Sequence, residues 1–175
     1  MPVKEGQAPK HRLSVPGGTL PRPPGTFDFM KIYLKEKDGN WKLYEGDLTE
    51  ELKARNITIG VGATVGERAR VGERATIGER ATIGEWARVG ERATVGEGAK
   101  IPTSYDCIVL GPLGSRAAML TGYLHEGKLM IGTGCFLDNV DKFEAAVKKN
   151  HAGNRHETEY LHAISYLRAK FGVKA

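Results

Sequence analysis

A six-residue period between Ile57 and Ile101 constrains the fold of this chain more than any other feature. A branched aliphatic residue recurs at every sixth position, and glycine directly follows each of the first seven. The aliphatic positions are Ile59, Val65, Val71, Ile77, Ile83, Val89, Val95 and Ile101. A period of six fits neither an α-helix nor the two-residue alternation of a long strand. Uninterrupted repeats of this length are typical of a parallel β-helix, in which short strands stack coil upon coil.

The chemistry of each repeat position agrees with such coils. Ile and Val pack well on a pleated surface, so one per short strand can fill the interior. The glycine that follows can adopt positive φ or let two backbones approach closely. An alanine stands four positions after each aliphatic residue, from Ala63 to Ala99, and leaves room for a large neighbour. The Glu, Arg and Thr positions then face water, either as a plain solvated surface or as a patch that binds a ligand or partner.

These repeats resemble the hexapeptide-repeat family, whose fold is a left-handed parallel β-helix of triangular section. In that fold three hexapeptides make one coil, so residues eighteen apart stack about 4.8 Å from each other. The expected interior columns are Ile59–Ile77–Val95, Val65–Ile83–Ile101 and Val71–Val89. On the outside, Arg70 is expected to stack with Arg88, Glu67 with Glu85, and Arg74 with Arg92.

The resemblance also implies functions to weigh. Most hexapeptide-repeat proteins are acyltransferases with a CoA-type donor and a histidine base, and some are zinc carbonic anhydrases with three histidine ligands. Residues 57–101 contain no His, Asp or Cys and no inserted loop. We therefore expect no metal and no cofactor, and carbonic anhydrase chemistry is excluded. An acyltransferase remains one alternative, with a base borrowed from the histidines outside the repeats, namely His125, His151, His156 or His162. A protein that binds or sequesters a small ligand such as a nucleotide is the other alternative.

Assembly into an oligomer is the favoured role for the repeats. Fewer than three coils bury little surface, so association with other subunits would stabilise them. The resemblance implies a homotrimer about an axis parallel to the coils. Trp86 stands alone at a position otherwise filled by Arg, which suits an intermolecular contact. The predicted oligomer interface comprises Arg70, Trp86 and Arg88.

The segments before the repeats divide into two. Residues 1–26 hold six of the eight prolines and few apolar residues, which predicts a basic, flexible arm. Residues 27–56 read as a hairpin with the turn Asp38-Gly39. Asp47 followed by Glu50 then predicts a capping box and a short helix to about Arg55. The hairpin and helix are expected to cap the first coil of the β-helix, which spans residues 57–104.

A small α+β domain is expected at residues 105–175. Three apolar or alternating segments, 107–110, 116–123 and 128–133, predict a three-stranded antiparallel sheet. Asp138 or Asn139 can cap a first helix, which places Val140, Phe143 and Val147 on one face. A second helix is predicted from about Glu157 to Phe171, with Tyr160, Ile164, Leu167 and Phe171 at helical spacing. The order βββαα indicates a sheet covered by two helices, so the whole chain is mainly β with an α+β unit at its end.

This last domain holds the candidate site. Two glycine-rich turns, at residues 111–116 and 132–136, flank a predicted hairpin whose own turn lies near Glu126. The two glycine-rich turns are therefore expected to meet at one end of this hairpin. Backbone N–H groups beside an arginine suit an anionic ligand such as a nucleotide, although no Walker motif is present. The predicted ligand-binding residues are Gly114, Ser115, Arg116, Gly134, Cys135, His151 and Asn154. The alternative is ordinary turn chemistry, with Arg116 at the surface and Cys135 as a small core residue.

The GPLGSR and GTGCF motifs, with His151, Asn154 and Tyr160, resemble a C-terminal domain of bacteriophage and prophage proteins. No chemistry follows from that likeness. A net charge of +5 permits nucleic-acid binding, but the excess is scattered, so such binding is not expected. The chain shows no transmembrane or signal segment, which favours a cytoplasmic location in a bacterial host. A non-enzymatic, trimeric scaffold or binding protein is the favoured function.

Overall fold

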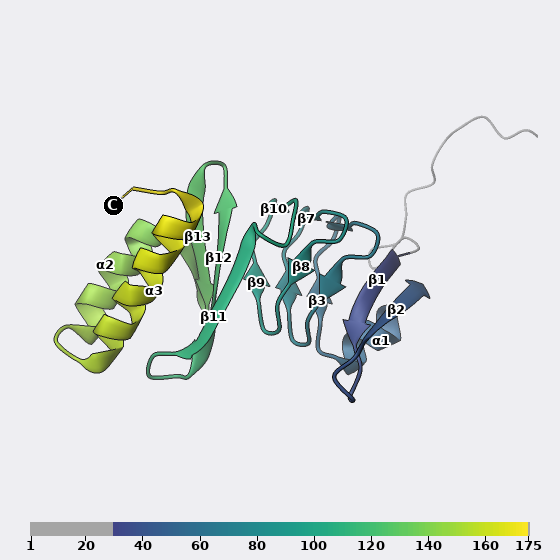
Figure 1. Cartoon of the computed structure of the whole chain (residues 1–175), viewed down its shortest axis with the longest axis horizontal. Helices are drawn as coiled ribbons and strands as arrows, with labels where there is room; N and C mark the ends of the chain where they lie inside the picture. The colour runs from purple at the N-terminus through teal and green to yellow at the C-terminus, as the bar shows by residue number, and fades with distance from the viewer. Residues whose placement is uncertain (1–29, 175) are drawn as a thin grey trace, which may run out of the picture.

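The computed structural model describes residues 30–174, so the predicted arm at residues 1–26 lies outside the described residues. Three parts follow one another along the long axis of the molecule (Figure 1). A hairpin with a short helix stands at one end, a stack of short strands lies in the middle, and a sheet covered by two helices closes the other end. The chain is thus a mixed α/β protein with mostly strands and several parallel sheets.

The repeats form short strands that pair in parallel, eighteen residues apart. The strands are β3 (Thr58–Ile59), β4 (Thr64–Val65), β5 (Arg70–Val71), β6 (Thr76–Ile77), β7 (Thr82–Ile83), β8 (Arg88–Val89), β9 (Thr94–Val95) and β10 (Lys100–Ile101). Two three-stranded sheets have the orders β3-β6-β9 and β10-β7-β4, and β5 pairs with β8 in a third sheet. The predicted columns are confirmed: Ile59 pairs with Ile77, for example, and Arg70 with Arg88.

The repeated glycines allow close approach between coils. A Cβ atom built on Gly78 would lie 2.5 Å from the backbone nitrogen of Glu97, which no real contact tolerates. Positive φ occurs instead two positions after each such glycine, in the Arg column and at Trp86. The residues of that column with a side chain are Arg68, Arg74, Arg80, Trp86 and Arg92, at φ of 58°, 58°, 55°, 60° and 57°. Of the two roles predicted for the glycine, close approach is the one observed.

The N-terminal hairpin continues the third sheet beyond the first coil. It consists of β1 (Met30–Lys35) and β2 (Trp41–Gly46), and α1 (Thr49–Ala54) follows. Strand β1 pairs in parallel with β5 and antiparallel with β2, which gives the sheet order β2-β1-β5-β8. Alternate β1 side chains enter the coil core, where Ile32 and Leu34 are fully buried. The predicted hairpin is therefore confirmed, and it covers the end of the coils.

The predicted capping box is wrong. Leu48 occupies the N-cap of α1 and offers no side-chain acceptor. Asp47 instead accepts hydrogen bonds from the backbone N–H and the hydroxyl of Thr49. Because the aspartate stands one residue before the cap, the reciprocal contact with Glu50 does not form.

The C-terminal sheet has four antiparallel strands where three were predicted. These are β11 (Cys107–Leu113), β12 (Ala118–His125), β13 (Lys128–Thr133) and β14 (Phe136–Asn139), in that order across the sheet. The fourth strand was missed because its four residues lie between a glycine-rich turn and a helix cap. Helices α2 (Val140–His151) and α3 (Arg155–Phe171) follow. Asn139, one of the two residues predicted to cap the first helix, accepts a hydrogen bond from the N–H of Lys142 and caps α2.

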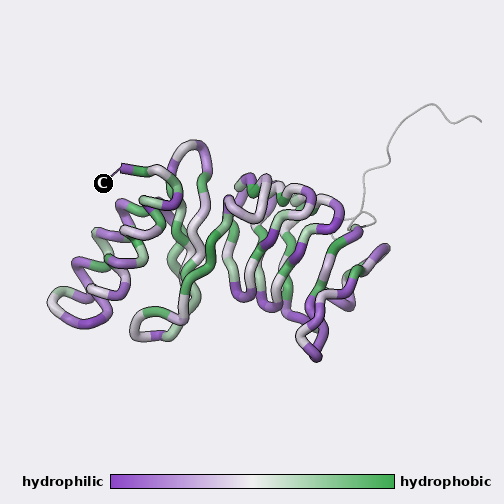
Figure 2. The backbone as a smooth tube through the Cα atoms, in the orientation of Figure 1, coloured by the Kyte–Doolittle hydropathy of each residue, from purple (hydrophilic) through white to green (hydrophobic). Residues whose placement is uncertain are grey.

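The two helices pack on one face of this sheet, and the end of the coil stack packs on the other (Figure 1). Apolar segments run through the strands, whereas the helices alternate between apolar and polar residues (Figure 2). The buried helix residues are Val140, Phe143, Val147, Tyr160, Ala163, Ile164 and Leu167. The predicted apolar faces of both helices are thus confirmed.

Two hydroxyl groups of β12 take the place of a further coil. Within the stack, the N–H groups of Thr76 and Gly78 donate to carbonyl oxygens of the next coil. The equivalent donors of the last coil are Thr94 and Gly96. Their N–H groups donate to the Thr121 Oγ1 at 3.0 Å and to the Tyr123 Oη at 2.8 Å. Both acceptor residues are buried, so the last donors of this sheet are satisfied without another strand.

Candidate functional site

A pocket opens at the end of the C-terminal unit where two connections meet. The β11–β12 turn and the α2–α3 connection lie at the same end of this unit (Figure 1). The β13–β14 turn lies at this end as well. The register shows this, because Leu113 pairs with Ala118 beside the first turn, Leu120 with Thr133, and Thr133 with Phe136 beside the second turn. The cavity has a volume of about 330 Å³. Its lining residues are Ser115, Arg116, Ala118, Thr133, Gly134, Cys135, Phe136, Phe143, Ala146, Val147, Asn150, His151 and Tyr160.

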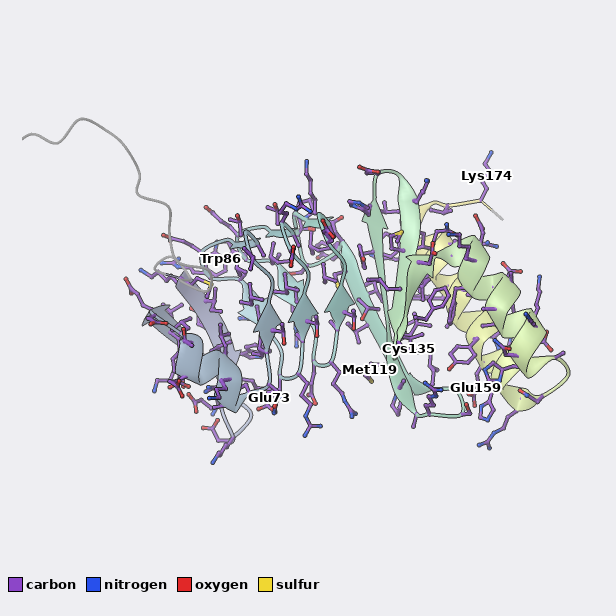
Figure 3. All side chains as sticks on the ribbon, turned by 180° about the vertical axis from the view of Figure 1, so that it is seen from behind. Glu73, Trp86, Met119, Cys135, Glu159 and Lys174 are labelled. Atoms are coloured by element: carbon purple, nitrogen blue, oxygen red, sulfur yellow. The ribbon has the colours of Figure 1, made fainter. Side chains whose placement is uncertain are left out.

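Five of the seven predicted ligand-binding residues line this one cavity. Ser115 and Arg116 come from the first glycine-rich turn, Gly134 and Cys135 from the second, and His151 from the last turn of α2. Figure 3 labels Cys135, in the β13–β14 turn, and Glu159, on α3, at this end of the unit. The convergence of the two turns, predicted from the hairpin connection, is therefore observed.

Gly114 and Asn154 do not line the cavity. Gly114 lies behind it at a φ of 68°, its N–H donates to the Glu159 Oε2 at 3.0 Å, and a side chain there would collide with the Tyr160 hydroxyl. Asn154 is the N-cap of α3, and its Oδ1 accepts from the N–H groups of His156 and Glu157. Both residues shape the loops around the pocket without facing into it.

Aromatic side chains form the apolar part of the cavity lining. The sequence interpretation had assigned these residues to a turn and to the core instead of to a binding site. Phe136 and Phe143 have ring centroids 5.1 Å apart, and Phe143 meets Tyr160 edge-on at 5.4 Å. The His151 ring lies 5.5 Å from the Tyr160 ring. The helical spacing of Phe143 and Tyr160 correctly indicated burial, but it could not show that one edge of this cluster borders a cavity.

The charges around the pocket favour an anion. Arg116 and His151 line it, and none of the lining residues is acidic. Burial raises the pKa of the Tyr160 hydroxyl, and the nearby charges of Glu159 and Arg116 act on it in opposite directions. Glu159 stands outside the lining, where hydrogen bonds from His156 and from the Gly114 N–H lower the pKa of its carboxyl group. That carboxylate holds the first turn against α3, and within residues 30–174 no carboxylate forms an ion pair with Arg116.

The two cysteines differ in environment. Cys135 is exposed at the pocket, whereas Cys107 is buried beside the coil core. Burial raises the pKa of the Cys107 thiol to about 12, so this sulfur stays protonated and unreactive at neutral pH. The prediction of a small core cysteine thus describes Cys107 and not Cys135.

A second feature lies on the coils, on the outer side of the third sheet. We call it the arginine–aromatic face; its members are Tyr33, Trp41, Arg68, Arg70, Trp86 and Arg88. The Arg70 guanidinium carbon lies 5.7 Å from the Tyr33 ring centroid and 5.9 Å from that of Trp41. Arg88 lies 5.6 Å from the same Trp41 ring. At the adjoining corner Arg68 stacks on Trp86 at 5.0 Å, and 57% of Trp86 remains exposed.

The predicted interface residues Arg70, Trp86 and Arg88 therefore fall within one continuous surface. Trp86 and Glu73 mark different corners of the coils (Figure 3). Within residues 30–174, no carboxylate lies within ion-pairing distance of the three arginines of this face. Arg80, on another corner, does pair with Glu97. The sequence interpretation missed Tyr33 and Trp41, because their place beside the repeats depends on how the hairpin docks.

Other kinds of site were sought in the same residues. Between residues 30 and 174, no three or more His, Cys, Asp or Glu side chains are grouped so that they could hold a metal ion. That part of the chain also lacks a helix with the length and apolar character needed to cross a membrane. Comparison with protein-family models, with curated proteins and with solved structures finds no match to this chain.

Proposed function

We propose that this protein is a non-enzymatic homotrimeric scaffold of the kind encoded by phages and prophages. In this proposal the repeats form a left-handed parallel β-helix that assembles the subunits, and the C-terminal unit binds an anionic ligand. The observation that carries the assembly role is the arginine–aromatic face. The parallel sheets with eighteen-residue offsets support the β-helix, and its hand follows from the likeness to hexapeptide repeats. An experimental density map that resolves side chains would decide the hand.

The composition of the arginine–aromatic face supports a protein contact. Trp, Tyr and Arg are the residue types most enriched among those that dominate binding energy at protein interfaces, whereas Lys is depleted there. The members of this face are of those three types, and Lys31, Lys35 and Glu45 share the outer side of the same sheet at its hairpin end. Stacking on an aromatic ring also pre-orders each guanidinium, so less side-chain entropy is lost on association.

A second copy of the chain can supply the missing carboxylates. Six of the seven coil corners that follow a repeat glycine carry Glu, from Glu67 to Glu97, and among the described residues only Glu97 of this series pairs with an arginine. Glutamates recur at the same eighteen-residue spacing as Arg70 and Arg88, so two copies with parallel coil axes present matching ladders. A contact between different faces of identical subunits closes into a ring when the rotation between neighbouring subunits is a whole fraction of a turn. A ring of three is the state that the family likeness implies.

The binding role of the C-terminal unit rests on the pocket. Its lining combines Arg116, His151 and Ser115 with no acidic residue. An arginine can contact an oxyanion through two N–H groups, and such charge-assisted hydrogen bonds are stronger than neutral ones. Because the pocket lies at the far end of the molecule from the hairpin, ligand binding and assembly use separate surfaces.

The test of assembly is a mass measurement by light scattering. We expect about three times the chain mass of 19.1 kDa at micromolar concentration. Trp86→Arg, which restores the residue common at this repeat position, combined with Arg88→Glu should yield monomers with an unchanged circular-dichroism spectrum. Lys100→Glu is the matched control, because Lys100 also precedes an interior aliphatic but lies on another sheet. A monomeric wild-type protein, or a double variant that stays trimeric, would refute this proposal.

A further inference from the structure

We propose that the C-terminal pocket binds a small carboxylate with an apolar ring. This inference rests on the anion-binding role proposed above and names the class of ligand. It follows from the two unlike walls of the cavity, from its size and from the number of charges that it offers.

One wall suits an apolar ring. Phe136, Phe143 and Val147 present carbon surface, and the tilted and edge-on arrangement of the aromatic rings can accept a further ring in the same manner. The alanines at positions 118 and 146 leave open the space that larger side chains would fill. A bare inorganic anion would leave this wall in contact with water.

The polar part of the lining suits a single carboxylate. Arg116 is the only lining residue that carries a full positive charge at neutral pH irrespective of its surroundings, and its planar fork matches the two oxygens of a carboxylate. Ser115, Asn150 and the His151 ring also line the cavity and can supply further hydrogen bonds. A phosphate monoester carries up to two charges and three acceptor oxygens, which calls for more cationic donors than this part of the lining provides.

The volume limits the ligand to about one ring. About 330 Å³ is at the lower end of the range for small-molecule pockets, roughly 300 to 1,000 Å³. A nucleotide, which the sequence interpretation allowed, has both a base and a sugar and carries phosphate charge. A ring with one carboxylate places its apolar part on the phenylalanines and its charge at Arg116 within this space.

The anchoring of the first turn supports a preformed site. The Glu159 carboxylate accepts from the Gly114 N–H and lies 3.2 Å from the His156 Nδ1, so the turn that carries Ser115 and Arg116 is tied to α3. Gly114 packs directly on Tyr160, which itself borders the cavity. A turn held in this way loses little freedom on binding, and pre-organisation of this kind favours affinity.

The test is calorimetric titration of the full chain with four probes: benzoate, its neutral amide benzamide, phenyl phosphate and inorganic phosphate. We expect benzoate to bind and both benzamide and inorganic phosphate to bind at least about tenfold more weakly, because each lacks one of the two features. Phenyl phosphate is expected to bind more weakly than benzoate. Arg116→Gln should weaken benzoate binding about tenfold or more. Lys149→Gln, an exposed charge removal on α2 outside the cavity lining, should leave the affinity unchanged.

The outcomes separate the ligand class from the site itself. If inorganic phosphate or phenyl phosphate binds as well as benzoate, and Arg116→Gln abolishes that binding, the anion site stands and the carboxylate class is wrong. If benzamide equals benzoate, the pocket is merely apolar, and both the class and the anion role are overturned. If none of the three anions binds to the folded wild-type chain, the proposed anion-binding role fails together with this inference.

Discussion

The coil stack and the C-terminal unit are built on opposite plans. In the coils one environment is repeated, so each interior Ile or Val meets another Ile or Val eighteen residues away. In the C-terminal unit every core position is different, and its pocket brings together residues from two turns and two helices. Because the repeat is regular, the strand pairing can be predicted directly from the sequence. The same side chains, however, recur on every face of the coils. The topology of the C-terminal unit is harder to predict from its sequence because no pattern repeats there. This unit nevertheless brings unlike residues together in one place, which a specific site requires.

The largest expected effect breaks the repeat itself. Gly78→Ala places a Cβ 2.5 Å from the backbone nitrogen of Glu97, and backbone within a stacked coil cannot yield. We expect the free energy of unfolding to fall by about 3 kcal/mol, the upper end for overpacking. Urea denaturation measures this change.

Gly62→Arg is the control for this change. Gly62 has a φ of 71° in the column that Arg occupies in other coils, and its nearest neighbour would be a side chain at 3.5 Å. This variant should change stability by less than about 1 kcal/mol. Equal losses for the two variants would contradict the close-approach role of the first glycine.

A smaller effect is expected where the two regions join. Tyr123→Phe removes the hydroxyl that accepts from the Gly96 N–H, and it leaves a buried donor without a partner. Such a loss costs about 1–3 kcal/mol. Chemical denaturation should show it, and hydrogen exchange should show faster exchange of the Gly96 amide. Tyr105→Phe is the control, because Tyr105 is 75% exposed; an unchanged Gly96 amide in Tyr123→Phe would contradict the role of this hydroxyl as a substitute for a further coil.

The smallest effect separates structure from binding within the C-terminal unit. Asn154→Ala removes the N-cap of α3 and should reduce the free energy of unfolding by about 1 kcal/mol. Asn154→Asp keeps a capping oxygen and should remain close to wild-type stability. Because Asn154 lies outside the cavity lining, benzoate affinity should be the same in both variants, as calorimetry can check. If Asn154→Asp keeps wild-type stability but loses benzoate affinity, Asn154 takes part in ligand binding and its assignment as a cap alone is wrong.

The candidate site was predictable in part. The glycine-rich turns and the hairpin that joins them placed Ser115, Arg116, Gly134 and Cys135 at one end of a sheet, because antiparallel pairing brings the ends of consecutive strands together. His151 was expected in the link between the two helices, and the structure instead places it in the last turn of α2. The aromatic wall could not be predicted, since the spacing of Phe143 and Tyr160 is the same for a core residue and for a residue that borders a cavity.

The sequence by itself determined the coils. Pairing at a regular offset is a local, repeated choice, and the side-chain period of six dictates which residues face inward and where glycine must stand. Only the tertiary structure decided which surfaces the ends of the stack present. The hairpin brings Tyr33 and Trp41 beside Arg70 and Arg88, and β12 brings Thr121 and Tyr123 to the last coil. Each of these contacts joins a residue of the repeats to a residue outside them, 27 or more positions away in the sequence. They therefore depend on how whole elements dock, which no local pattern of residues encodes.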